Sequence, residues 1–173
     1  MKIRYLILAI IGAMVLSLGL VACGDDDDDN GGNGNGGGEV TLVEYFSALE
    51  ALSQTFDADV DLLDAGENLD EFITFVESLH SATHDFVDDL DGLNAPDEVG
   101  EAHGEAVTAG GELADMYDNA ITVLDLSETV EDAQLVLTGP GFVDSQERFA
   151  AACVDLQGIA DSNALDVDLA CPS

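Results

Sequence analysis

Apolar side chains recur at steps of three and four residues from residue 42 to residue 163, which is the spacing of one face of an α-helix. Alternation at every second position, typical of a strand, is confined to the C-terminal tail, residues 164–173. The predicted inward stripe of the first helix contains Leu42, Tyr45, Phe46, Leu49, Leu52, Phe56, Val60 and Leu63. The chain is therefore expected to be all-α.

Local signals predict where the first two helices begin and end. Thr41 with Glu44 and Asn68 with Glu71 have the spacing of capping pairs, in which the first side chain accepts from the backbone three residues on. Gly66 is expected to end the first helix as its C-terminal cap.

Prolines and glycines predict the later boundaries. Pro96 suits the first turn of a third helix, and Ser127 is expected to cap a short helix over residues 128–137. The sequence Thr138-Gly139-Pro140-Gly141 predicts a break before a last helix that runs from Phe142 to near Asn163.

The third helix contains four glycines, each costing roughly 1 kcal/mol relative to alanine. Close approach of a neighbouring helix is the expected compensation. The glycines are Gly100, Gly104, Gly110 and Gly111.

Short connections make sequential helices antiparallel neighbours. We therefore predict that residues 39–173 form one domain, an up-down-up-down four-helix bundle with a short extra helix and a C-terminal tail lying against it. The alternative is a less regular helical domain in which residues 128–137 pack as a fifth element.

The N-terminal part has the layout of a secretion signal. Lys2 and Arg4 precede the apolar run 5–22, which ends in Leu20-Val21-Ala22-Cys23. This tetrapeptide resembles a lipobox, and the whole chain resembles the uncharacterised small bacterial lipoproteins with a helical domain, which implies a placement but no activity.

The resemblance implies cleavage of residues 1–22 and acylation of Cys23, with more than one acyl chain for stable anchoring. The alternative is that residues 5–22 remain as a transmembrane helix, and both readings put the rest of the chain outside. Residues 23–38, rich in aspartate and glycine, are expected to be a disordered tether.

Charge limits the classes of partner. The chain has 37 acidic residues and 3 lysines and arginines, and only Arg148 of those bases lies beyond the signal. Nothing remains to contact a phosphate backbone, so nucleic-acid binding is excluded. This balance favours a basic protein partner or cations.

Cys153 and Cys171 are the two cysteines left after the anchor. Exported domains form disulfides, so a bridge is predicted that pins the tail to the last helix and is worth ~3 kcal/mol. A buried thiol pair or a redox couple is the alternative.

His80 and His84, one helical turn apart, are the candidate metal ligands, with acids such as Glu77 nearby. The alternative places His103 in the core, His80 at its boundary and His84 on the surface. No P-loop, dinucleotide fingerprint or Gly-x-Ser-x-Gly motif occurs. The sequence therefore favours a lipid-anchored, non-enzymatic interaction or structural module of the cell envelope without cofactors, and the alternative is an extracytoplasmic cation-binding protein.

Overall fold

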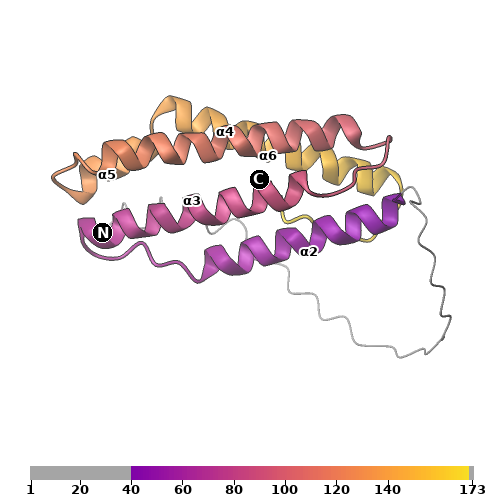
Figure 1. Cartoon of the computed structure of the whole chain (residues 1–173), viewed down its shortest axis with the longest axis horizontal. Helices are drawn as coiled ribbons and strands as arrows, with labels where there is room; N and C mark the ends of the chain where they lie inside the picture. Colours follow the sequence, from indigo (N-terminus) through magenta and orange to yellow (C-terminus); the bar gives the residue numbers. More distant parts are fainter. Residues whose placement is uncertain (1–39, 172–173) are drawn as a thin grey trace. The chain divides into compact units, whose positions relative to one another are not determined.

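The computed structural model describes residues 40–171, which lie in one compact unit (Figure 1). Within that range every regular element is an α-helix. The elements are α2 (Leu42–Asp61), α3 (Leu69–Asp91), α4 (Gly100–Leu124), α5 (Val130–Leu137) and α6 (Pro140–Ser162).

The predicted bundle is confirmed. Figure 1 shows the long helices running side by side, and each antiparallel to the one before it. The helix pairs in broad contact are α2–α3, α3–α4 and α4–α6, while the short α5 packs against α3, α4 and α6. The pair α2–α6, which would close the bundle, is not among them.

The core follows the predicted stripes, because a three-and-four spacing turns one face of each helix inward. In α4 the residues at three-and-four spacing are all buried, namely Ala106, Gly110, Leu113, Tyr117, Ala120 and Leu124. Phe56 and Val60, in the last turns of α2, are only half-buried, although the predicted stripe placed them inward. Phe75 of α3 is also a core residue. No helix of residues 40–171 is long and apolar enough to cross a membrane.

Two predicted boundaries of the first and third helices are wrong. Helix α2 is capped by Leu62 in right-handed conformation, and Gly66 lies beyond it in the loop with a φ of 68°. Pro96 precedes α4, because residues 96–99 form a turn in which the Val99 N–H donates to the Pro96 carbonyl at 3.0 Å. The capping pairs at Thr41 and Asn68 are both present.

The boundaries around α5 also differ from the prediction. Thr129, not Ser127, caps α5, because its hydroxyl accepts from the Asp132 N–H at 3.1 Å. Helix α6 begins at Pro140, whose missing N–H is not needed in a first turn. The break is therefore shorter than predicted.

Of the four glycines of α4, only Gly110 meets a neighbouring helix. A Cβ at Gly110 would lie 2.6 Å from Cγ2 of Val87 and 3.2 Å from Cε2 of Phe149. At the other three positions a Cβ would have no neighbour within 4 Å, so close packing does not explain them. Those three are Gly100, Gly104 and Gly111.

The turn after α6 directs the tail back onto the bundle. The Ala164 N–H donates to the Asp161 carbonyl at 3.0 Å, and the Leu165 N–H to the Ala160 carbonyl at 3.1 Å. These two bonds form a Schellman motif, which places Ala164 in the left-handed region at φ 53°. An alanine thus occupies a position that favours glycine.

Candidate functional site

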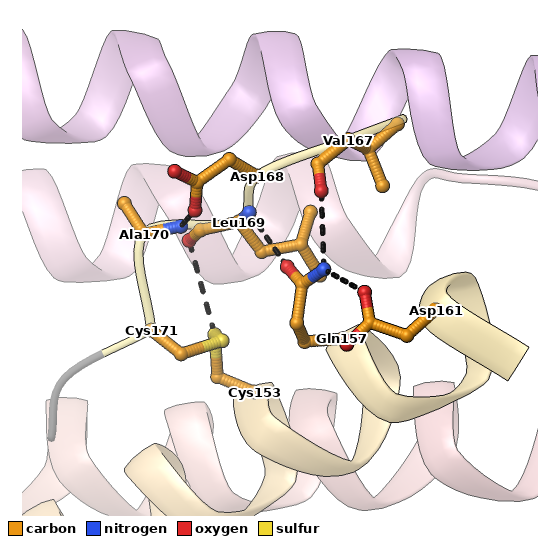
Figure 2. Close-up of a disulfide and its surroundings, with 8 residues drawn as sticks. All are labelled: Cys153, Gln157, Asp161, Val167, Asp168, Leu169, Ala170 and Cys171. Atoms are coloured by element: carbon orange, nitrogen blue, oxygen red, sulfur yellow. Dashed lines mark hydrogen bonds between the residues drawn. A yellow bond between two sulfur atoms is a disulfide. The ribbon is translucent and has the colours of Figure 1, made fainter. Parts of the chain in front are cut away.

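Part of the predicted site lies outside the described residues. Cys23, the lipobox, the signal of residues 1–22 and the tether of residues 23–38 all precede residue 40, and they stay predictions. The described residues that combine a covalent link, a pocket and specific hydrogen bonds belong to the tail, residues 164–171, which we call the strap (Figure 2).

The strap is fixed to α6 by the predicted disulfide. Cys153 of α6 and Cys171 are joined, with their Cα atoms 5.6 Å apart. Cys153 Sγ also lies 3.9 Å from the Leu169 carbonyl oxygen. Because a disulfide sulfur carries no hydrogen, we take this approach as a packing contact.

Gln157 holds the strap backbone one turn further along α6. Its Nε2 donates to the Val167 carbonyl at 3.0 Å, and its Oε1 accepts from the Leu169 N–H at 2.9 Å. Nε2 also donates to Asp161 Oδ1 at 2.9 Å, which orients the amide (Figure 2). The amide thus pairs with the strap as a residue of a neighbouring parallel strand would.

Helix α2 contacts the strap from the other side. Glu50 Oε1 accepts from the Asp168 N–H at 3.0 Å. The Asp168 side chain in turn accepts from the Ala170 N–H at 2.9 Å. Since Gln157 lies on α6 and Glu50 on α2, the strap bridges the two helices that do not pack broadly on each other.

A buried leucine anchors the strap in an apolar pocket. Leu169 is only 4% exposed, while its neighbours Asp168 and Ala170 are more accessible. A cavity of about 30 Å³ remains beside Leu169. We call the surface under the strap the strap groove: it comprises Glu50 and Gln157 with the cavity-lining Leu49, Ser53, Phe86, Leu90, Ala106, Phe149, Cys153 and Leu156.

The groove is electrostatically unfavourable for the acidic strap. Burial raises the pKa of Asp57 on α2, and the carboxylates of Asp61 and Asp168 raise it further. The carboxylate of Asp168 therefore repels that of Asp57.

The predicted metal ligands do not form a cluster. His80 and His84 have ring centroids 6.2 Å apart, but His80 Nε2 lies 3.5 Å from Asp118 and His84 Nδ1 lies 3.4 Å from Asp88. Among residues 40–171, no group of three or more histidines, cysteines or acids is placed to hold a metal ion. Cation binding at His80 and His84 stays a prediction.

His103 is half-buried rather than in the core, where one reading of the sequence placed it, and it has a partner that sequence reasoning missed. Its Nδ1 lies 3.0 Å from the hydroxyl of Tyr45, whose ring is 1% exposed. Burial lowers the pKa of His103, and nearby Asp91 opposes that shift. In a neutral imidazole, Nδ1 accepts a hydrogen bond from the Tyr45 hydroxyl in one tautomer and donates one to it in the other.

Gln157 and Glu50 were also missed. A signal for Gln157 existed, because it follows Cys153 by one helical turn and therefore lies on the face that the bridged tail must cross. Glu50 has no such signal, since its contact depends on how α2 packs. No protein-family model, curated protein or solved structure matches the chain.

Proposed function

We propose that this chain is a lipid-anchored, non-enzymatic helical domain on the extracytoplasmic side of a cell membrane, where it acts as an interaction or structural module. The observation that carries the proposal is Leu20-Val21-Ala22-Cys23 at the junction between an apolar signal and an acidic tether. A helical unit beginning at Val40, with a disulfide, is consistent with export to an oxidising compartment.

The anchor places the domain on the outer leaflet of the cytoplasmic membrane, or on the outer membrane of a cell that has one. Gly24, rather than an aspartate, follows Cys23 directly, and this resembles lipoproteins sorted to the outer membrane. The acidic tether favours a domain held away from anionic headgroups, because like charges repel.

Replacement of the acylated residue tests the proposal. Cys23→Ala should abolish acylation, so that the protein keeps an uncleaved signal and its mass lacks the acyl chains. Globomycin should block maturation of the native chain in the same way. The matched control, Cys171→Ser, removes a cysteine from the strap and should leave acylation intact. A Cys23→Ala protein with the same processed mass and membrane fractionation as the native chain would refute the anchor.

A further inference from the structure

The strap groove has the features of a peptide-binding site. The Gln157 amide recognises the backbone on both sides of residue 168, Glu50 accepts a third backbone hydrogen bond, and an apolar pocket takes the side chain at position 169. Backbone hydrogen bonds combined with a side-chain pocket are how proteins bind extended peptides. The strap already occupies this site as an intramolecular ligand.

The strap fits the groove imperfectly in two respects. Leu169 leaves a cavity of about 30 Å³ unfilled, and an unfilled apolar cavity forfeits packing contacts. The Asp168 carboxylate lies close enough to Asp57 of α2 to help raise the pKa of Asp57, in addition to burial and the neighbouring Asp61. A basic side chain at position 168 would replace this repulsion with attraction.

We propose that the strap groove binds an extended segment of a basic partner protein, with apolar side chains at alternate positions and a basic residue between them, and that the strap is a place-holder released by reduction of the Cys153–Cys171 disulfide. The proposal deepens the proposed function, since it names the partner class of the interaction module. The chemistry of the groove specifies the bound segment. Gln157 requires an extended backbone, the apolar pocket favours an apolar side chain, and the acidic side chains of α2 favour a basic one.

The disulfide explains why the groove is closed in the oxidised protein. The disulfide fixes the Cys171 end of the strap, and the other end continues directly from α6, so the segment is held at both ends. A segment held in this way has an effective concentration in the millimolar range, and a free peptide at micromolar concentration cannot displace it. Reduction frees the Cys171 end, so the strap then competes for the groove through one link only. Both cysteines are half-buried rather than fully enclosed, and the reductant that the proposal requires is a small dithiol protein. A thiolate of that reductant attacks one sulfur to form a mixed disulfide, and its second thiol resolves it, leaving two thiols on this chain and a disulfide on the reductant.

Peptide binding to the full-length protein in detergent tests the proposal. The probe is a fluorescent peptide that copies the strap with serine in place of Cys171 and lysine in place of Asp168, Ala-Leu-Asp-Val-Lys-Leu-Ala-Ser. The comparison peptide has the same serine but retains the aspartate. The oxidised native protein should bind neither. The double variant Cys153→Ser, Cys171→Ser should bind the lysine peptide about tenfold more tightly than the aspartate peptide in 0.05 M salt, with a smaller difference in 1 M salt.

Further variants on that background locate the site. Leu169→Asp should strengthen peptide binding, because a charged side chain cannot re-enter the pocket and the strap stops competing. Gln157→Ala should weaken binding at least tenfold, whereas Gln146→Ala on the same helix should leave it unchanged. A scrambled peptide of the same composition should not bind.

Three results would overturn the proposal. One is a folded double variant that binds neither peptide, and another is binding that Gln157→Ala leaves intact. The third is loss of the helical circular dichroism signal when the bridge is removed, since the strap would then be a structural element that the bundle cannot release. The acylation of Cys23 is measured separately, by mass spectrometry of the same samples. A failure of peptide binding would therefore leave the proposed lipid anchor unaffected.

Discussion

The Tyr45 hydroxyl lies 3.0 Å from Nδ1 of His103 and joins α2 to α4 at a partly buried position. The two rings are edge to face, with centroids 5.8 Å apart. A buried phenol without a partner would leave an unsatisfied donor, which costs about 1–3 kcal/mol. The contact with His103 therefore allows the Tyr45 side chain to be buried between α2 and α4, near the start of α2.

This burial predicts instability in alkali. Desolvation raises the pKa of both Tyr45 and Tyr117 to about 12. A raised native pKa means that the unfolded state releases its protons first, so the stabilising contribution is full below about pH 10 and is lost as pH rises toward 12. Between about pH 10 and 12, each tyrosine should lower the free energy of unfolding by up to about 1.4 kcal/mol per pH unit.

Absorbance at 295 nm and urea midpoints at pH 9 and 11 measure the effect. In a chain without residues 1–22, and therefore without Tyr5, phenolate absorbance should rise only with unfolding. Tyr45→Phe should reduce the pH dependence of the midpoint. Ionisation of both tyrosines near pH 10 in the folded protein would contradict the prediction.

Two adjacent glycines of α4 should respond oppositely to alanine. Gly110→Ala introduces a Cβ against Val87 and Phe149, and such overpacking costs about 1–3 kcal/mol. This cost exceeds the stability that the helix gains from the higher helix propensity of alanine. Gly111→Ala has no neighbour to displace and should stabilise the protein by about 1 kcal/mol. Thermal unfolding followed by circular dichroism decides it, and equal effects at both positions would show that α4 is not packed closely at Gly110.

Ala164→Gly should stabilise the fold by about 1 kcal/mol. Ala164 has a φ of 53°, and the left-handed conformation costs an L-residue about 1–2 kcal/mol that glycine avoids. The matched control is Ala151→Gly in the exposed interior of α6, which should destabilise by about 1 kcal/mol. Urea midpoints of the two variants should therefore shift in opposite directions. A loss of stability in both would mean that the Schellman turn does not form.

Excess acid predicts that mild acidification and salt both stabilise the protein. Arg148, the sole lysine or arginine of residues 40–171, contacts Glu112, so most carboxylates have no basic partner in this range. Burial and two neighbouring acids raise the pKa of Asp57, hence the native state binds more protons and its stability increases as pH falls from 7 toward about 5. The lowered pKa values of Glu44 and Glu71 reverse this trend only in stronger acid, where those carboxylates become protonated.

Urea midpoints at pH 5 and 7, in 0.05 and 1 M sodium chloride, test this prediction. Asp57→Asn should raise the midpoint at pH 7 and weaken its pH dependence, whereas Asp59→Asn, at an exposed position of the same helix, should do less. Salt shortens the Debye length from about 10 Å at 0.1 M to about 3 Å at 1 M, so the midpoint should rise with salt. A midpoint that is flat in both salt and pH would refute the role of repulsion.

The sequence by itself determined the fold class, the number of long helices and most of the buried stripe. These features depend on residues that are close in sequence. A three-and-four spacing defines the inward face of a single helix, and a capping pair such as Thr41 with Glu44 involves a single helical turn. The disulfide between Cys153 and Cys171 was also predictable, because these are the two cysteines that remain once Cys23 is assigned to the anchor. Boundaries at Gly66, Pro96 and Ser127 were predicted wrongly, since several residues in each loop are able to end or cap a helix.

Only the tertiary structure decided which contacts join separate elements. Gly110 meets Val87 and Phe149 because α4 lies between α3 and α6, whereas the identical residue Gly111 points elsewhere. Glu50 and Gln157 are 107 positions apart and become partners of one strap because the strap lies against both α2 and α6, which do not pack broadly on each other. A one-dimensional pattern specifies which face of a helix is buried, but the neighbour on that face is fixed only when all the helices pack together.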